Sequence, residues 1–188
     1  MMKEKKTQAY AYMFIARNKD NRDIEGFKER SRTFLSTKTP DELMPAFEAF
    51  VNDGQDKEVC RCYRSVNPRD LEKTKKKLIV ALVESDDADM LLRMDAKAVS
   101  LAMQPDCAAE RRWLFDFDCD DADSLQEFIE DVRTLSGLED VSYTKTPHGY
   151  AVITSRGFDT RELMKKWNEQ CELKRDAMLF VCMKMKQS

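Results

Sequence analysis

Trp113-Leu114-Phe115-Asp116-Phe117-Asp118 is the stretch that decides the fold class of this chain. Side chains on a β-strand point alternately to its two faces, so the aromatic residues share one face, and Leu114, Asp116 and Asp118 share the other. The segment 123–137 that follows has apolar residues at helical spacing, an acidic residue at its start and a glycine at its end. A strand followed by such a helix predicts a sheet covered by helices.

The segments around this stretch continue the alternation of strand and helix patterns. Alternating or β-branched apolar runs predict strands, and runs with one apolar face predict helices. The expected strands are 10–16, 58–66, 111–118, 141–145, 150–154 and 176–183, and the expected helices are 24–35, 40–51, 68–82, 88–103, 123–135 and 159–167. Because a hairpin is combined with helical crossovers, we expect an α+β fold with a mixed β-sheet and packed helices.

Two helix starts carry local capping signals. Thr39-Pro40-Asp41-Glu42 has capping-box spacing, with proline at the first helical position. Asn67 stands directly before Pro68 and is expected to cap the following helix, which carries a lysine-rich face.

Length and composition predict one domain over residues 1–188. The chain has 42% hydrophobic residues, enough to fill a core of that size. Its formal net charge of −3 creates no overall field that would draw it onto nucleic acid or acidic lipid. Neither a signal peptide nor a run of roughly 20 apolar residues is evident. We therefore expect a soluble, cytoplasmic protein with no membrane partner.

The six cysteines do not form a metal-binding pattern. They contain no C-x-x-C pair, and His148 is the only histidine in the sequence. Reduced thiols packed as small apolar side chains are expected here rather than a zinc site.

Asp116 and Asp118 are the candidate metal ligands. Two carboxylates side by side on a sheet are costly unless they reach water or a cation neutralises them. Mg²⁺ or Mn²⁺ accepts such oxygens and keeps open positions for phosphate and water. The alternative is a solvated strand end, with the acids from Asp118 to Asp123 as an acidic loop and helix cap. A haloacid-dehalogenase-like phosphatase also has an Asp-x-Asp motif, but Asp120 stands where that family has a small hydroxyl or valine.

Three motifs, taken in order, resemble the catalytic core of the archaeo-eukaryotic primase superfamily, above all the small primase-polymerase-like proteins of phages and plasmids. They are Phe115-Asp116-Phe117-Asp118, Lys145-Thr146-Pro147-His148-Gly149-Tyr150 and Lys174-Arg175-Asp176. The resemblance spans roughly 58–183, and residues 1–57 are expected to extend the same domain.

This resemblance implies a primase-polymerase-like core with a two-metal nucleotidyl-transfer site. It implies that Asp116, Asp118 and Asp176 are the catalytic carboxylates and hold Mg²⁺ or Mn²⁺. It further implies that the turn between the two hairpin strands contacts a nucleotide, and the residues concerned are Lys145, Thr146, His148, Gly149 and Tyr150.

One position departs from the pattern of that superfamily. The superfamily has a histidine on the strand after the glycine, and Ala151 occupies that position here. Three functions therefore stay open. The first is nucleotidyl transfer with a nucleoside triphosphate or nucleic acid as partner. The second is a catalytically inactive nucleic-acid-binding module. The third is a protein-interaction or regulatory domain with no metal site.

Basic residues before the aspartate strand are candidates for nucleic-acid binding. Arg64 lies on an expected strand, and Arg69 lies close to an expected helix N-terminus, where backbone N–H groups favour a phosphate. The lysines from Lys73 to Lys77 follow on that helix, and they fit either a phosphate-binding patch or a simple solvated face.

Overall fold

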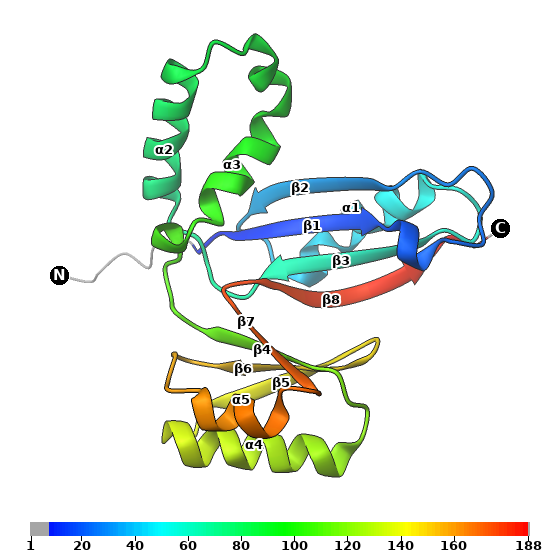
Figure 1. Cartoon of the computed structure of the whole chain (residues 1–188). Helices are drawn as coiled ribbons and strands as arrows, with labels where there is room; N and C mark the ends of the chain where they lie inside the picture. The colour runs from blue at the N-terminus through cyan, green and yellow to red at the C-terminus, as the bar shows by residue number, and fades with distance from the viewer. Residues whose placement is uncertain (1–7, 188) are drawn as a thin grey trace. The chain divides into compact units, whose positions relative to one another are not determined.

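The computed structural model describes residues 8–187. The chain divides into two compact units. The first comprises the residues up to Ala109 together with those from Phe180 onward, and the second comprises Glu110–Leu179. Each unit contains a four-stranded sheet and a hydrophobic core of its own (Figure 1). The single domain expected over 1–188 stays a prediction. Within the described part of the chain, every helix is too short or too polar to cross a membrane.

The first unit is built on a sheet with strand order β2-β1-β3-β8. Its strands are β1 (Tyr10–Ala16), β2 (Arg30–Ser36), β3 (Val59–Ser65) and β8 (Met178–Met185). Helix α1 (Pro40–Asn52) packs Phe47 and Phe50 against Phe14 of β1 and the cysteines of β3. The strand expected at the start of the chain is confirmed, and so is the apolar face of α1.

Helix α1 begins at the predicted capping box. The Thr39 hydroxyl accepts a hydrogen bond from the Glu42 backbone N–H at 3.3 Å, and the Glu42 carboxylate accepts one from the Thr39 N–H at 2.8 Å. Each side chain therefore satisfies a backbone donor that the helix leaves free.

The helix expected over 24–35 is wrong. The second half of that segment forms β2, which pairs antiparallel with β1 from Arg30 opposite Ala16 to Ser36 opposite Tyr10. Gly26 adopts a left-handed conformation with φ 67°, which ends any helical path before the strand. The local pattern of Ser31, Thr33 and Leu35 fits a strand, and tertiary pairing with β1 decides the outcome.

A pair of helices extends from the first sheet. The pair consists of α2 (Leu71–Glu84) and α3 (Met94–Ala102), joined through the 3₁₀ helix η2 (Ala88–Arg93), and α3 lies against β2 (Figure 1). The cap of α2 is Asp70, which accepts hydrogen bonds from the backbone N–H groups of Glu72 and Lys73 at 3.0 and 3.1 Å. The expected cap, Asn67, is wrong because it lies three residues too early.

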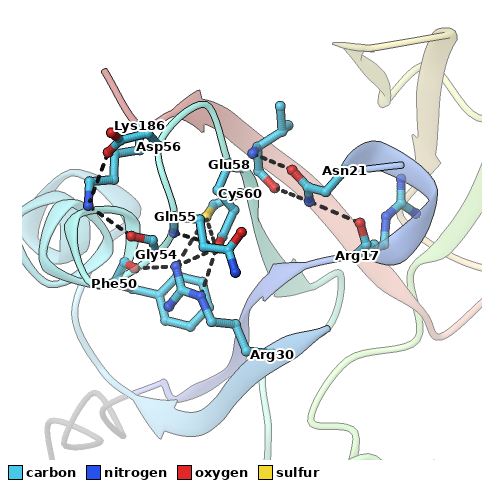
Figure 2. A network of polar contacts seen from close by, with 11 residues as sticks. Arg17, Asn21, Arg30, Phe50, Gly54, Gln55, Asp56, Glu58, Cys60 and Lys186 are labelled. Atoms are coloured by element: carbon cyan, nitrogen blue, oxygen red, sulfur yellow. Dashed lines mark hydrogen bonds and ion pairs between the residues drawn. The ribbon is translucent and has the colours of Figure 1, made fainter. Parts of the chain in front are cut away.

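A buried ion pair ties the end of α1 to the first sheet (Figure 2). Glu58 is 2% exposed, and its carboxylate accepts hydrogen bonds from Arg30 Nε at 2.7 Å and from the Gln55 backbone N–H at 2.9 Å. Arg30 also donates to the Phe50 carbonyl at 2.6 Å and lies over the Phe50 ring. A Cβ on Gly54 would lie 2.5 Å from both charged groups, so a side chain there would displace the ion pair. Since the carboxylate is fully paired, this cluster is structural.

The second unit is built on a sheet with strand order β5-β6-β4-β7. Its elements are β4 (Trp113–Phe117), α4 (Ala122–Ser136), β5 (Val141–Thr146), β6 (Gly149–Thr154), α5 (Arg161–Trp167) and β7 (Cys171–Arg175). Both helices cover the same face of the sheet (Figure 1), where Phe115 and Phe117 pack against Phe128 and Trp167. The strand, the helix after it and the hairpin are as predicted.

The α+β class is confirmed, and the mixed sheet is wrong because both sheets are antiparallel. Helix α4 does connect β4 to a strand, β5, that runs in the same direction as β4, as a crossover helix would. The returning strand β5 then pairs with β6 rather than with β4, and β6 runs antiparallel to both. The hairpin therefore separates the two strands that a mixed sheet would have paired.

Candidate functional site

The register of β4 with its two neighbours builds the candidate site. Phe115 and Phe117 point toward α4 and α5, so Asp116 points to the opposite face of the sheet, here called the aspartate face. Asp116 pairs in register with Ala151 of β6 on one side and with Glu172 of β7 on the other. A carboxylate pair across strands and a small neutral side chain thus meet on one face.

Lys174 neutralises part of this carboxylate group. Its Nζ lies 2.8 Å from Glu172 Oε2 and 3.3 Å from Asp116 Oδ2. Lys174 shares the face of Glu172 because the two residues are two apart on β7, and the register of β7 against β4 shifts next to it, between the pairs Leu114–Arg175 and Phe115–Leu173. The side chains of Asp116 and Lys174 are about one-third exposed, so solvent and solutes reach both.

Asp118 stands at the end of β4, two residues from Asp116 on the aspartate face. Its backbone N–H donates to the Gln170 carbonyl at 2.7 Å, which holds the end of the strand in place. Desolvation is the largest cause of a raised pKa of Asp118, and the neighbouring Asp116 carboxylate adds to it. Lys174 and His148 oppose that rise in the pKa. The two aspartates therefore act on each other electrostatically.

The hairpin between β5 and β6 packs directly on the end of β4. Thr146 pairs with Gly149, so Pro147 and His148 form a two-residue turn. A Cβ on Gly149 would lie 2.1 Å from the Phe117 carbonyl oxygen and 2.9 Å from the Cys119 nitrogen. The space at Gly149 is therefore filled by the backbone that carries the aspartates, and it leaves no room for the nucleotide contact that the resemblance implies at this residue.

The five predicted nucleotide-binding residues divide between the two faces of the sheet. Tyr150 pairs in register with Phe117, so its side chain shares the helix-covered face, and Lys145 lies over its ring at 4.2 Å. Lys145 also forms an ion pair with Asp120. Thr146 shares the face of Asp116, and the exposed His148 is near enough to Asp118 to lower its pKa. The structure brings His148 and Thr146 to the aspartate side, and it does not bring Lys145 or Tyr150 there.

Asp176 lies outside the candidate site. Strand β7 runs antiparallel to β4, with Cys171 opposite Phe117 and Arg175 opposite Leu114, so Asp176 follows at the end of β4 remote from Asp118. Its expected place beside the two aspartates on a strand is wrong, because the chain turns there between β7 and β8. Glu172 takes the place beside Asp116 instead.

Arg64 and Arg69 belong to the first unit, and both side chains pack against other parts of that unit. Arg69 is 2% exposed and donates to the Ala102 carbonyl at the end of α3 at 3.4 Å. Arg64 stacks over the Tyr10 ring, with 4.6 Å between guanidinium carbon and ring centre. A phosphate on the surface cannot reach the buried Arg69 side chain in this conformation, so its proposed grip on nucleic acid has no geometric support.

Glu172 was missed from the sequence, and Lys174 was named only as part of the motif Lys174-Arg175-Asp176, without a role of its own. Cys171-Glu172-Leu173-Lys174-Arg175 does show the alternation of apolar and polar residues that predicts a strand. That signal identifies the strand but not its neighbour, and only the pairing of β7 with β4 places Glu172 beside Asp116.

The donor chemistry suits a hard cation held by few protein ligands. Between residues 8 and 187 no group of three His, Cys, Asp or Glu side chains is arranged to hold a metal ion. Asp116 and Asp118 form a pair, and Glu172 is engaged by Lys174. Mg²⁺ is commonly held by one or two carboxylates, with water and substrate phosphate completing its shell. The pair fits that mode and does not fit a closed structural site.

In comparisons with known proteins, no family model, no curated protein and no solved structure matches this chain.

Proposed function

We propose that the aspartate face binds a divalent cation, Mg²⁺ or Mn²⁺, together with a phosphate of a nucleotide or nucleic acid. The observation that carries the proposal is that Asp116 lies on the face of β4 away from the helices, bonded to the Lys174 ammonium, and that Asp118 directly follows the strand and interacts electrostatically with both. A hard cation between such carboxylates gains favourable oxygen ligands and relieves their mutual repulsion.

The groups around the carboxylates suit a phosphate. Lys174 Nζ is bonded to Asp116 and Glu172, and a cation at the aspartates would weaken its hold on Asp116. The ammonium then has donors to offer to an anion bound next to the cation. His148 is exposed in the turn and acts electrostatically on Asp118, so its ring N–H groups are candidates to donate to the same anion. A bound cation with two hydrogen-bond donors beside it is an arrangement that binds a phosphate coordinated to a metal ion.

Nucleotidyl transfer is the activity that this site would serve on a primase-polymerase-like core. Paired metals, when bound, stabilise the attacking and leaving oxygens of an in-line displacement. The protein would hold the triphosphate with Lys174 and His148 and keep the carboxylates in place through the packing of Gly149 on β4. Glu172, rather than Asp176, is the third carboxylate in reach of this group.

A second candidate function is nucleic-acid binding without catalysis, and Ala151 favours it. Ala151 pairs in register with Asp116 and is 4% exposed, so it stands directly beside the aspartate where the resembled superfamily has histidine. An alanine methyl group can neither donate to a phosphate nor carry a proton.

Triphosphate binding and primer extension in Mn²⁺ distinguish these functions. We expect the parent protein to bind a labelled nucleoside triphosphate only with Mn²⁺ present, and Asp116→Asn to abolish binding, while Asp140→Asn, which changes an exposed acid before β5, leaves it unchanged. Extension of a primed template supports transfer, and binding without extension supports the inactive module. A parent protein that binds no triphosphate would overturn both and favour an interaction domain.

The cysteines support a reducing compartment. All six are free thiols, and burial raises the pKa of Cys171 and of Cys60 to about 12, which keeps these two protonated and unreactive. On this ground, and because the proposed ligand is a nucleotide or nucleic acid, we propose that the protein works in a cytoplasm.

A further inference from the structure

Helix α2 has an apolar outer face. The helix packs against α3 through the side that carries Thr74, which is 3% exposed, and the half-buried Leu78 and Leu82. On its other side Ile79 and Val80 are each about half exposed, and Val83 is 81% exposed. Figure 1 shows α3 on the sheet side of the helix pair and α2 on the far side. None of these three side chains belongs to the core of the first unit as the structure describes it between residues 8 and 187.

Two further apolar side chains are exposed in the segment after α2. In the 3₁₀ helix η2, Leu91 is 61% exposed and Leu92 is 85% exposed, at the same end of the helix pair. Together with Ile79, Val80 and Val83 they leave on the order of 500 Å² of apolar side-chain surface in water at this end of the helix pair. Exposed apolar surface on this scale is often functional in soluble proteins.

The charges along α2 are complementary to those of the same helix turned end to end. Lys76, Val80 and Glu84 are spaced by four residues, so they lie in one row on the helix surface, and all three are exposed. Lys76 stands four residues before Val80, and Glu84 stands four residues after it, each about 6 Å along the axis. Two copies of α2 packed antiparallel at Val80 would place Lys76 of each copy beside Glu84 of the other.

We infer that α2 is a self-association surface on which a second copy of this chain docks its own α2, antiparallel, around a two-fold axis at Val80. A two-fold axis uses the same patch on both copies, and the row of Lys76, Val80 and Glu84 is self-complementary in that way. Burial of Ile79, Val80 and Val83 stabilises the pair, while the two ion pairs, one on either side of the axis, fix its register. The inference concerns the first unit and does not depend on cation or phosphate binding.

Sedimentation velocity over a concentration series tests the docking face. We expect the parent protein to dimerise at micromolar concentration, and Val83→Asp to raise the dissociation constant at least about tenfold, because a carboxylate would be buried at the interface. Leu135→Asp likewise replaces an exposed apolar side chain by a carboxylate, on α4, and it is expected to leave the constant unchanged. A monomeric parent, or a dimer that tolerates Val83→Asp, would overturn the inference.

Charge exchange tests the register independently of folding. Lys76→Glu and Glu84→Lys are each expected to weaken the dimer by about tenfold, because each creates two like-charge contacts, and the double variant is expected to restore the parent constant. Two surface substitutions that merely destabilised the fold would not compensate each other. Failure of the double variant to recover would overturn the antiparallel pairing. A monomer that binds anionic lipid vesicles through Val83 would assign the face to a membrane and also overturn it.

Discussion

Lys174 Nζ lies 3.3 Å from Asp116 Oδ2 and joins the aspartate to Glu172 of the neighbouring strand. The Lys174 ammonium thus forms an ion pair with one of the two carboxylates that would bind a divalent cation. Because both cations are attracted to the same oxygens, Lys174 and the metal compete for Asp116, and the phosphate of a ligand can take over the displaced ammonium. This relationship links cation binding to anion binding at one side chain.

Replacing Lys174 should therefore separate the two binding events. We expect Lys174→Met to raise the affinity for Mn²⁺ alone severalfold, since the competing charge is gone, and to lower the affinity for Mn²⁺-triphosphate, since a donor is lost. Calorimetric titration measures both. Lys165→Met, at an exposed position of α5, is the control and should change neither. If Lys174→Met leaves both affinities at the parent values, Lys174 has no part in the site.

Gly149 should matter through the backbone of β4. Even the Cβ of Gly149→Ala would lie 2.1 Å from the Phe117 carbonyl oxygen, so the end of β4 must shift and carry Asp118 with it. We expect Gly149→Ala to lower the melting temperature and to weaken Mn²⁺ and triphosphate binding together. In Gly26→Ala nothing lies within 4 Å of the new Cβ, so that variant should lose about 1 kcal/mol to backbone strain alone and bind Mn²⁺ normally. Intact Mn²⁺ binding by Gly149→Ala would disprove this coupling.

Asp70 should contribute to the stability of the first unit as the cap of α2. Asp70→Ala leaves the Glu72 and Lys73 backbone N–H groups without their acceptor and should cost about 1 kcal/mol in chemical denaturation. Asp70→Asn keeps an acceptor oxygen and should recover most of that loss. Equal stability of parent and Asp70→Ala would show that the helix begins elsewhere.

The local signals in the sequence predicted much of this fold, since they depend on neighbouring residues. The capping box at Thr39, the glycine exit of α4 at Gly137 and the two-residue turn of the hairpin all have near-neighbour causes. The N-terminus of α4 differs from the prediction in one respect. The capping residue is Asp121 rather than Asp123, and it accepts the hydrogen bond from the Ser124 N–H at 2.8 Å. A one-turn stretch with several acids offers more than one cap.

The parts that failed depend on contacts between distant segments. The strand β2 forms because β1 lies beside it, and Glu172 joins Asp116 because β7 lies beside β4. Arg69 reads as an exposed helix-start residue, yet it is buried by a backbone bridge to Ala9 and by the end of α3. The site could thus be predicted as far as its two aspartates on one strand, and not as far as the groups that neighbouring strands supply.

Acid should destabilise the first unit through Asp20. Burial alone would raise the pKa of Asp20, but hydrogen bonds from Arg17 at 2.9 Å and from Arg61 at 2.6 Å hold it below the usual value. A carboxyl group whose pKa is lowered in the folded state stabilises it fully above the unfolded pKa of about 3.9 and loses that contribution as the pH falls through the folded value. We expect the stability of the parent protein to fall as the pH is lowered from about 5 to 3.

Asp20→Asn isolates this contribution. At pH 7 it should cost about 3 kcal/mol, because Arg61 is left buried beside an uncharged group, and its deficit relative to the parent should shrink as the pH falls. Asp159→Asn is the control, since Arg161 lowers the pKa of Asp159 to about 2 but both side chains are exposed and screened. Thermal melts at several pH values give the comparison, and a deficit for Asp20→Asn that stays constant with pH would contradict the assignment.

Isothermal titration calorimetry of the protein with Mn²⁺ tests the central claim most directly. We predict a binding isotherm for the parent protein, weakened at least about tenfold by Asp116→Asn and by Asp118→Asn alike, because both carboxylates contribute to one site. Asp140→Asn should bind as the parent does. The absence of any binding by the parent at millimolar Mn²⁺, or binding that survives both aspartate substitutions, would contradict the account.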